Sequence, residues 1–315
     1  MSWIELESVF SIIGIYAILA VSLNMICGVT GLLQLGHAGF FAIGAYAAGL
    51  VSIYFTIPEL GFLNLFIGIA AAMLSAGIVA LALGIPCLRL RGDYLAIATL
   101  GFGEIVRLCL VNITFPGGKM FEDERIGGSL GISFTEFPED IWAKFPDYSA
   151  KYATLPVIAI ALIITYIILR NIKMSSIGRA LMCIREDEIA ASSMGINVAK
   201  FKILSFVISA AFGGLAGALF FHNELAISPG SFTLLCSIEI LLMVVLGGMG
   251  SLSGSILGAI ILGFIPTLFS YIGLGEYKQI FYALMLILLI RVTPNGLFGM
   301  NELPKILSRR NQNNA

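Results

Sequence analysis

Long runs of apolar residues recur along the whole chain, and they constrain its fold more than any other feature. A helix needs about 20 consecutive, mostly apolar residues to cross the hydrocarbon core of a bilayer. Runs of this kind occur at 8–27, 36–55, 62–84, 94–113, 155–170, 203–221, 234–247, 252–270 and 279–292. We therefore predict an all-α polytopic integral membrane protein with about eight to ten transmembrane helices, forming a single domain over residues 1–315.

The composition excludes a soluble enzyme. Charged residues make up 12% of the chain and hydrophobic residues 58%, whereas soluble domains carry charge on about a quarter of their residues. The net charge of -1 offers no basic face to a nucleic acid, so no nucleic-acid partner is expected. A membrane-embedded enzyme is disfavoured because the chain has two histidines and no HExxH motif. The five cysteines form no CxxC pair, and we expect neither disulfide, metal site nor cofactor.

The charged residues are concentrated in two stretches that predict the orientation. The stretch 170–202 holds six Lys or Arg residues, and cytoplasmic loops are enriched in these residues. The stretch 112–154 holds seven acidic residues against four basic ones and is predicted to be an external loop. Nine spans then place the N-terminus outside and the basic C-terminal tail in the cytoplasm. The first ten residues lack the basic start of a secretory signal, so the first run is expected to be a retained helix.

Two glycine-rich segments suggest either close helix packing or broken helices around a translocation pathway. They read GVTGLLQLGHAGFFAIGAYAAG at 28–49 and GGMGSLSGSILGAIILG at 247–263. Small residues let helix backbones touch in lipid, while irregular backbone survives there only beside protein or water. Their occurrence once in each half favours an internal duplication. The candidate pathway residues are Gly36, His37, Gly39, Gly44, Glu104, Gly247, Gly248, Gly250 and Gly254.

Three of the polar residues within the apolar runs have both structural and functional interpretations. His37 is either a packing residue or a proton relay. Glu104 and Arg107 lie three positions apart, close enough on a helix to form an ion pair. Because a single charge at mid-bilayer is costly, the pair either clamps the structure or faces a pathway.

The stretch from Ser175 to Lys202 predicts an amphipathic cytoplasmic helix. Ile177, Leu181 and Ile184 share one face, with Ser175 or Ser176 able to cap the start and Gly195 able to end the helix. The apolar stripe packs either on the membrane or the protein's own helices, or on another subunit.

Four stretches together resemble a known family. They read GRALMCIREDEIAASSMGINVAKFKILSFVISAAFGGLAGALF, GLLQLGHAGFFAIGAYAAG, RLRGDYLAIATLGFGEIVRL and VLGGMGSLSGSILGA, and they resemble the LivM-type membrane subunits of bacterial branched-chain amino acid ABC importers. The resemblance implies a multi-pass permease of the bacterial cytoplasmic (inner) membrane. It also implies a second homologous permease subunit, two cytoplasmic ATPase subunits and an external substrate-binding protein as partners, in addition to membrane lipid.

The resemblance further implies that residues 171–202 are a cytoplasmic coupling segment that contacts the ATPases. The residues predicted for this role are Gly178, Arg179, Leu181, Ile184, Arg185, Glu186, Asp187, Glu188, Ala190, Ala191, Met194 and Gly195. The order EIAASSMG is similar to the EAA signature of ABC importer permeases but has one extra residue after the glutamate. The chain contains no G-x-x-x-x-G-K-[ST] phosphate loop, as expected if ATP is hydrolysed by separate subunits.

The family is built on inverted repeats, whereas nine spans make the two glycine-rich segments parallel. A missed half-membrane segment within 86–107 would reconcile the two. Within the family, a carrier of urea or short amides is the main alternative to a carrier of branched-chain, aliphatic amino acids. Outside it, the alternative is an ion-coupled secondary transporter, for which Glu104 and Glu239 would be the membrane carboxylates.

Overall fold

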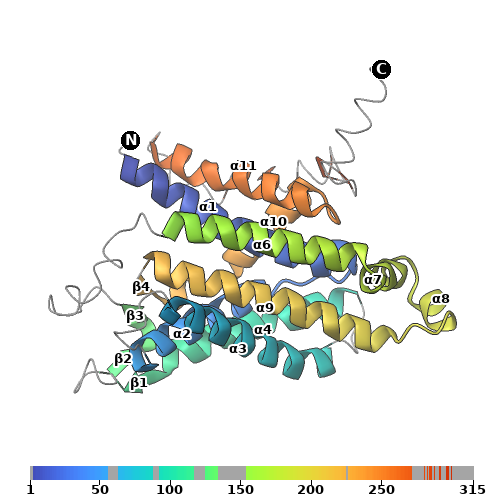
Figure 1. The fold of residues 1–315 in the computed structure, drawn as a ribbon, viewed down its shortest axis with the longest axis horizontal. Helices are drawn as coiled ribbons and strands as arrows, with labels where there is room; N and C mark the ends of the chain where they lie inside the picture. The colour runs from blue at the N-terminus through green and yellow to red at the C-terminus, as the bar shows by residue number, and fades with distance from the viewer. Residues whose placement is uncertain are drawn as a thin grey trace. The chain divides into compact units, whose positions relative to one another are not determined.

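The computed structural model describes residues 3–55, 63–87, 92–116, 125–133, 154–224 and 226–271, together with residues 280, 282, 284, 285, 287, 291, 296, 297 and 299. Within these residues, eight helical segments are long and apolar enough to cross a membrane. The helices of these segments are α1 (Trp3–Asn24), α2 (His37–Phe55), α3 (Leu63–Cys87), α4 (Asp93–Asn112), α6 (Thr154–Met174), α9 (Val198–Glu224), α10 (Leu234–Gly247) and α11 (Leu252–Tyr271). Two short helices, α7 (Ser176–Glu186) and α8 (Glu188–Ser193), lie between α6 and α9 (Figure 1).

These helices confirm the polytopic all-α fold and eight of the nine predicted spans. The ninth, 279–292, lies largely outside the described residues. The half-membrane segment expected within 86–107 is wrong, because α3 and α4 are each long enough to cross. The expectation of short and broken helices is confirmed by α10, which has 14 residues, and by the interruptions after α1 and α10.

The chain divides into two compact units, each described here by itself. Unit 1 comprises residues 1–33, 161–205 and 238–315. Within it α1 and α11 pack antiparallel: the rings of Phe10 and Phe264 lie 5.7 Å apart, while Asn24, at the other end of α1, bonds to Ser255. α10 and α11 form an antiparallel hairpin, since Gly247 meets Gly254 and Met243 meets Gly258.

Unit 2 comprises residues 34–160 and 206–237. Its helices pack through small residues on α3, where every fourth position is buried: Gly68, Ala72, Ala76, Ala80 and Gly84. This spacing keeps small side chains on one face, which lets α9 approach so closely that a Cβ at Gly214 would come within 2.5 Å of the Ala72 carbonyl oxygen. A cluster of aromatic rings, formed by Phe41, Phe220 and Phe232, fills the space beside α2.

Part of the predicted external loop belongs to unit 2 and forms two short antiparallel strand pairs. Strand β1 (Thr114–Pro116) pairs antiparallel with β2 (Arg125–Gly127), and β3 (Ile132–Ser133) pairs antiparallel with β4 (Ala226–Ile227), which follows α9. A short 3-10 helix, η4 (Gly128–Leu130), joins β2 and β3 and carries the exposed Ser129. The seven acidic residues on which the loop prediction depends lie outside the described residues.

Candidate coupling segment and helix breaks

The predicted coupling segment is two helices rather than one. As expected, the Ser175 hydroxyl caps the start of α7 by accepting from the amide of Ile177 at 3.2 Å, and Gly195, at φ 84°, follows the end of α8. The prediction of one continuous helix is wrong at Asp187. Its backbone is extended and its carboxylate accepts from the amides of Ile189 and Ala190, so it caps a new helix, α8.

The apolar stripe of α7 is covered by this chain. Leu181 is 0% exposed and Ile184 2% exposed. Gly178 is also buried, since a Cβ there would lie 2.0 Å from the carbonyl oxygen of Lys173. The prediction that the stripe is free to dock on another subunit is therefore wrong for Leu181 and Ile184, and the alternative of packing on the protein's own helices is confirmed.

The outward surface of the segment lies on α8 and its flanks. Ile189 is 74% exposed and Met194 78% exposed, so the described part of the chain leaves both of these large apolar side chains largely uncovered. Lys202, buried at the start of α9, forms an ion pair with Glu188 on α8 and so fixes the position of α8. Of the predicted coupling residues, Arg179, Glu186, Asp187, Ala190, Met194 and Gly195 are exposed, Arg185 and Glu188 are partly buried, and Ala191 is buried.

Each glycine-rich segment contains or adjoins a helix break. The first break follows α1, where the π-helical turn η1 (Met25–Val29) leads into non-helical residues 30–36. The second break is the non-helical stretch 248–251 between α10 and α11, where Gly248 and Gly250 adopt φ of 110° and 95°. Side chains other than glycine rarely adopt these angles, so the sequence permits the chain to turn here.

The other pathway candidates of unit 2 occupy close helix contacts. A Cβ at Gly36 would lie 1.9 Å from the Thr99 carbonyl oxygen of α4, and one at Gly44 would lie 2.3 Å from the Gly214 carbonyl oxygen of α9. Gly39 faces Gly103 of α4, and the buried ring of His37 lies beside Gly213. These contacts show that the glycines pack helices together, while a pathway role stays a prediction.

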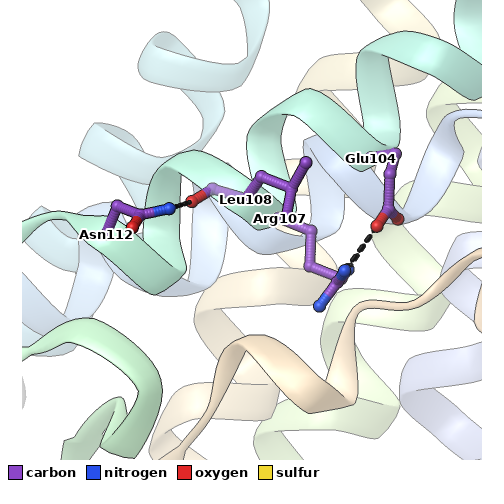
Figure 2. Close-up of polar contacts among 4 residues, drawn as sticks. All are labelled: Glu104, Arg107, Leu108 and Asn112. Atoms are coloured by element: carbon purple, nitrogen blue, oxygen red, sulfur yellow. Dashed lines mark hydrogen bonds and ion pairs between the residues drawn. The ribbon is translucent and has the colours of Figure 1, made fainter.

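Glu104 and Arg107 form the expected ion pair within α4. Arg107 Nε donates to Glu104 Oε1 at 2.9 Å, and the two side chains point toward each other along one side of the helix (Figure 2). The Glu104 side chain is 40% exposed and that of Arg107 26% exposed. Asn112, one turn beyond Leu108, donates to the Leu108 carbonyl at 2.7 Å near the end of the helix. The pair therefore neutralises two charges near the middle of a membrane-length helix.

Two residues that no sequence motif indicates bond to the second break. Asn24, the only amide side chain in the first apolar run, donates from Nδ2 to the Ser251 carbonyl at 2.8 Å and accepts at Oδ1 from the Gly250 amide at 2.7 Å. Lys173, at the end of α6, is 7% exposed and donates to the Gly250 carbonyl at 2.6 Å. In the sequence, the signal that could have pointed to Asn24 and Lys173 is a polar residue near the end of an apolar run.

Comparison with known proteins assigns the family. Residues 6–290 match the family described as "Branched-chain amino acid transport system / permease component". The chain belongs to this family. The permease is 39% identical over 309 residues to the high-affinity branched-chain amino acid transport system permease protein LivM of Escherichia coli, covering 91% of this chain and 68% of that protein.

Two further relatives show how widely the similarity extends. The permease is 28% identical to LivH of Salmonella typhimurium, over 92% of this chain and 93% of that protein. It is also 28% identical to the probable branched-chain amino acid transport permease protein LivM of Methanocaldococcus jannaschii, over 78% of this chain and 76% of that protein. No solved structure matches the permease.

Proposed function

We propose that the protein is the membrane-spanning permease subunit of an ATP-driven importer of the bacterial inner membrane and carries branched-chain aliphatic amino acids. The single observation that supports this most is the family match over residues 6–290. The importer would also contain a second homologous permease and two cytoplasmic ATPase subunits, and an external binding protein would deliver the substrate. Relatives of both the LivM and the LivH type support a paired arrangement.

The surface proposed to meet the ATPases is the exposed face of α8 and its flanks. Two large apolar side chains, Ile189 and Met194, are exposed on it, and the charged Glu186 and Asp187 directly precede α8 and are exposed as well. Protein interfaces typically have apolar side chains at their centre and polar or charged ones around the rim. The ion pair of Glu188 with Lys202 supports this assignment, because it holds the anchor residues on a fixed element.

On the external side, the proposed docking element for the binding protein is the 112–154 loop. Its described part is held by β3 and β4 pairing and presents Ser129 and Leu130, the latter 91% exposed. The proposed pathway residues are Gly36, His37, Gly39, Gly44, Glu104, Gly247, Gly248, Gly250 and Gly254.

Reconstitution tests the proposed function. The permease, its partner permease, both ATPases and the binding protein would be placed in vesicles with isotope-labelled leucine outside and ATP inside. Uptake should require ATP and the loaded binding protein. Uptake that follows a sodium or proton gradient without the ATPases would instead establish an ion-coupled transporter. Competition by urea or acetamide, with none by valine or isoleucine, would establish the alternative cargo.

A further inference from the structure

The two helix breaks lie against each other at one end of unit 1. α1 and α10 both run antiparallel to α11, so they run parallel and their carboxyl ends face the same way. At that end, a Cβ on Gly28 of the first break would lie 2.2 Å from the Gly250 amide nitrogen of the second. The basic residues of 170–202 place this end on the cytoplasmic side.

Two parallel helices whose carboxyl ends meet have an electrostatic problem. The last carbonyls of a helix have no partners within it and carry partial negative charge, so two such ends repel each other. Within a membrane these carbonyls cannot turn to water. Asn24, the last residue of α1, ties this helix to the second break and to the start of α11, because its Nδ2 donates to the Ser251 carbonyl and to the Ser255 hydroxyl while its Oδ1 accepts from the Gly250 amide.

Two cations from the predicted cytoplasmic segment bond to backbone carbonyls of the two breaks. Arg185, on α7, donates from Nη1 to the Gly28 carbonyl of the first break. Lys173, just before α7, donates to the Gly250 carbonyl of the second break at 2.6 Å. Arg185 thus stands at the carboxyl end of α1 and η1, where a positive charge is stabilising, and Lys173 stands at the turn where α10 ends and α11 begins. Lys173 lies at the end of α6, directly before α7, and Arg185 lies in the last turn of α7, 12 residues further along the chain.

We propose that Asn24, Lys173 and Arg185 form a cytoplasmic latch: they hold the two breaks together, and displacement of α7 withdraws both cations and lets the breaks separate. This inference rests on the proposed function, since it takes the movement of α7 from the ATPases. The three residues are positioning residues, which act on the backbone of the breaks rather than on substrate.

The latch is tested by hydrogen exchange on the complete importer in lipid nanodiscs, with and without a non-hydrolysable ATP analogue, read in peptides covering 25–33 and 247–255. In the wild type the analogue should raise exchange in both peptides. In Arg185→Gln and Lys173→Gln both peptides should exchange about tenfold faster without nucleotide, as expected from the loss of a charge-assisted hydrogen bond. Arg185→Lys and Lys173→Arg, which keep a donor, should restore slow exchange. Arg170→Gln, which removes an exposed cation from the same end of α6, should leave both peptides unchanged.

Leucine uptake and ATP hydrolysis, measured on the same preparations in vesicles, separate the two proposals. The latch predicts that Arg185→Gln and Lys173→Gln hydrolyse more ATP for each leucine transported. If the wild type transports leucine but the analogue changes hydrogen exchange in neither peptide, the latch is overturned. The three residues would then cap the breaks without moving. Hydrogen exchange at the wild-type rate in Arg185→Gln and Lys173→Gln overturns the latch as well. A wild-type complex that transports no leucine counts against the proposed function instead.

Discussion

At the scale of single residues, Glu104 and Arg107 show how this chain accommodates charge in a membrane helix. The pair is formed within α4 and needs no partner from another helix. It is nevertheless partly exposed near the middle of a span of which 17% is buried. A charged pair is poorly tolerated against hydrocarbon. We therefore expect this side of α4 to face the partner permease or the pathway in the assembled importer.

Glu104→Gln tests this pair, because it leaves the Arg107 guanidinium without its carboxylate. We expect a several-fold lower yield of monodisperse protein, measured by size-exclusion chromatography in detergent, since an unpaired charge in a span disfavours insertion. The double variant Glu104→Gln/Arg107→Met should recover the yield. If the single variant is inserted normally but the importer loses uptake, the carboxylate serves transport rather than insertion.

Gly254→Leu tests the contact between α10 and α11. A Cβ at Gly254 would lie 2.2 Å from the Gly247 carbonyl oxygen, so the larger side chain must force the hairpin apart. We expect the free energy of unfolding to fall by about 1–3 kcal/mol. The thermal midpoint should then be lower, and uptake should be lost. Gly101→Leu is the matched control for stability, because a Cβ there meets nothing within 4 Å. Equal midpoints for the two variants would contradict tight packing at Gly254.

At the scale of elements, the sequence predicts which segments are helical better than it predicts which faces are covered. The apolar periodicity of 177–184 correctly indicates an amphipathic helix, but a stripe looks the same whether its own chain or a partner covers it. The break at Asp187 was missed for a local reason. The sequence does not distinguish an aspartate inside a charged helix from one that caps a helix, whereas in the structure the extended backbone of Asp187 and the bonds that its carboxylate accepts from Ile189 and Ala190 do.

Two substitutions separate the buried stripe from the exposed anchor. Ile189→Asp should leave folding intact and weaken binding of the ATPase subunits about tenfold, as loss of an interface anchor commonly does. Leu181→Ala, by contrast, removes a fully buried side chain and should cost the permease about 2–5 kcal/mol of stability. Thermal unfolding of the isolated permease and co-purification with the ATPases measure the two effects. Unchanged co-purification of Ile189→Asp would remove α8 from the interface.

At the scale of the whole molecule, the sequence predicts the eight spans found among the described residues but not the contact between the breaks. Length and hydropathy are local properties, so eight runs of the sequence coincide with eight helices. The bond of Asn24 to Gly250 joins residues 226 positions apart. No periodicity within either segment indicates that the other is its neighbour. The parallel course of α1 and α10 agrees with the nine-span count, while the inverted repeat implied by the family stays a prediction.

The orientation of the chain in the membrane decides whether the latch faces the ATPases, and two exposed serines test it. Ser129 lies on η4 of the predicted external loop and Ser193 on α8 of the predicted cytoplasmic segment. In a background free of the five native cysteines, Ser129→Cys should react with a membrane-impermeant maleimide in intact spheroplasts. Ser193→Cys should react only after lysis, because the basic residues of 170–202 hold that side in the cytoplasm. Of the described helices, α6 is the one of membrane length between the two positions, so the two labels must differ if α6 crosses the membrane. Identical labelling of both would mean that α6 fails to cross. Reversed labelling would keep the fold but place the helix breaks outside, and the latch would then lie beyond reach of any ATPase.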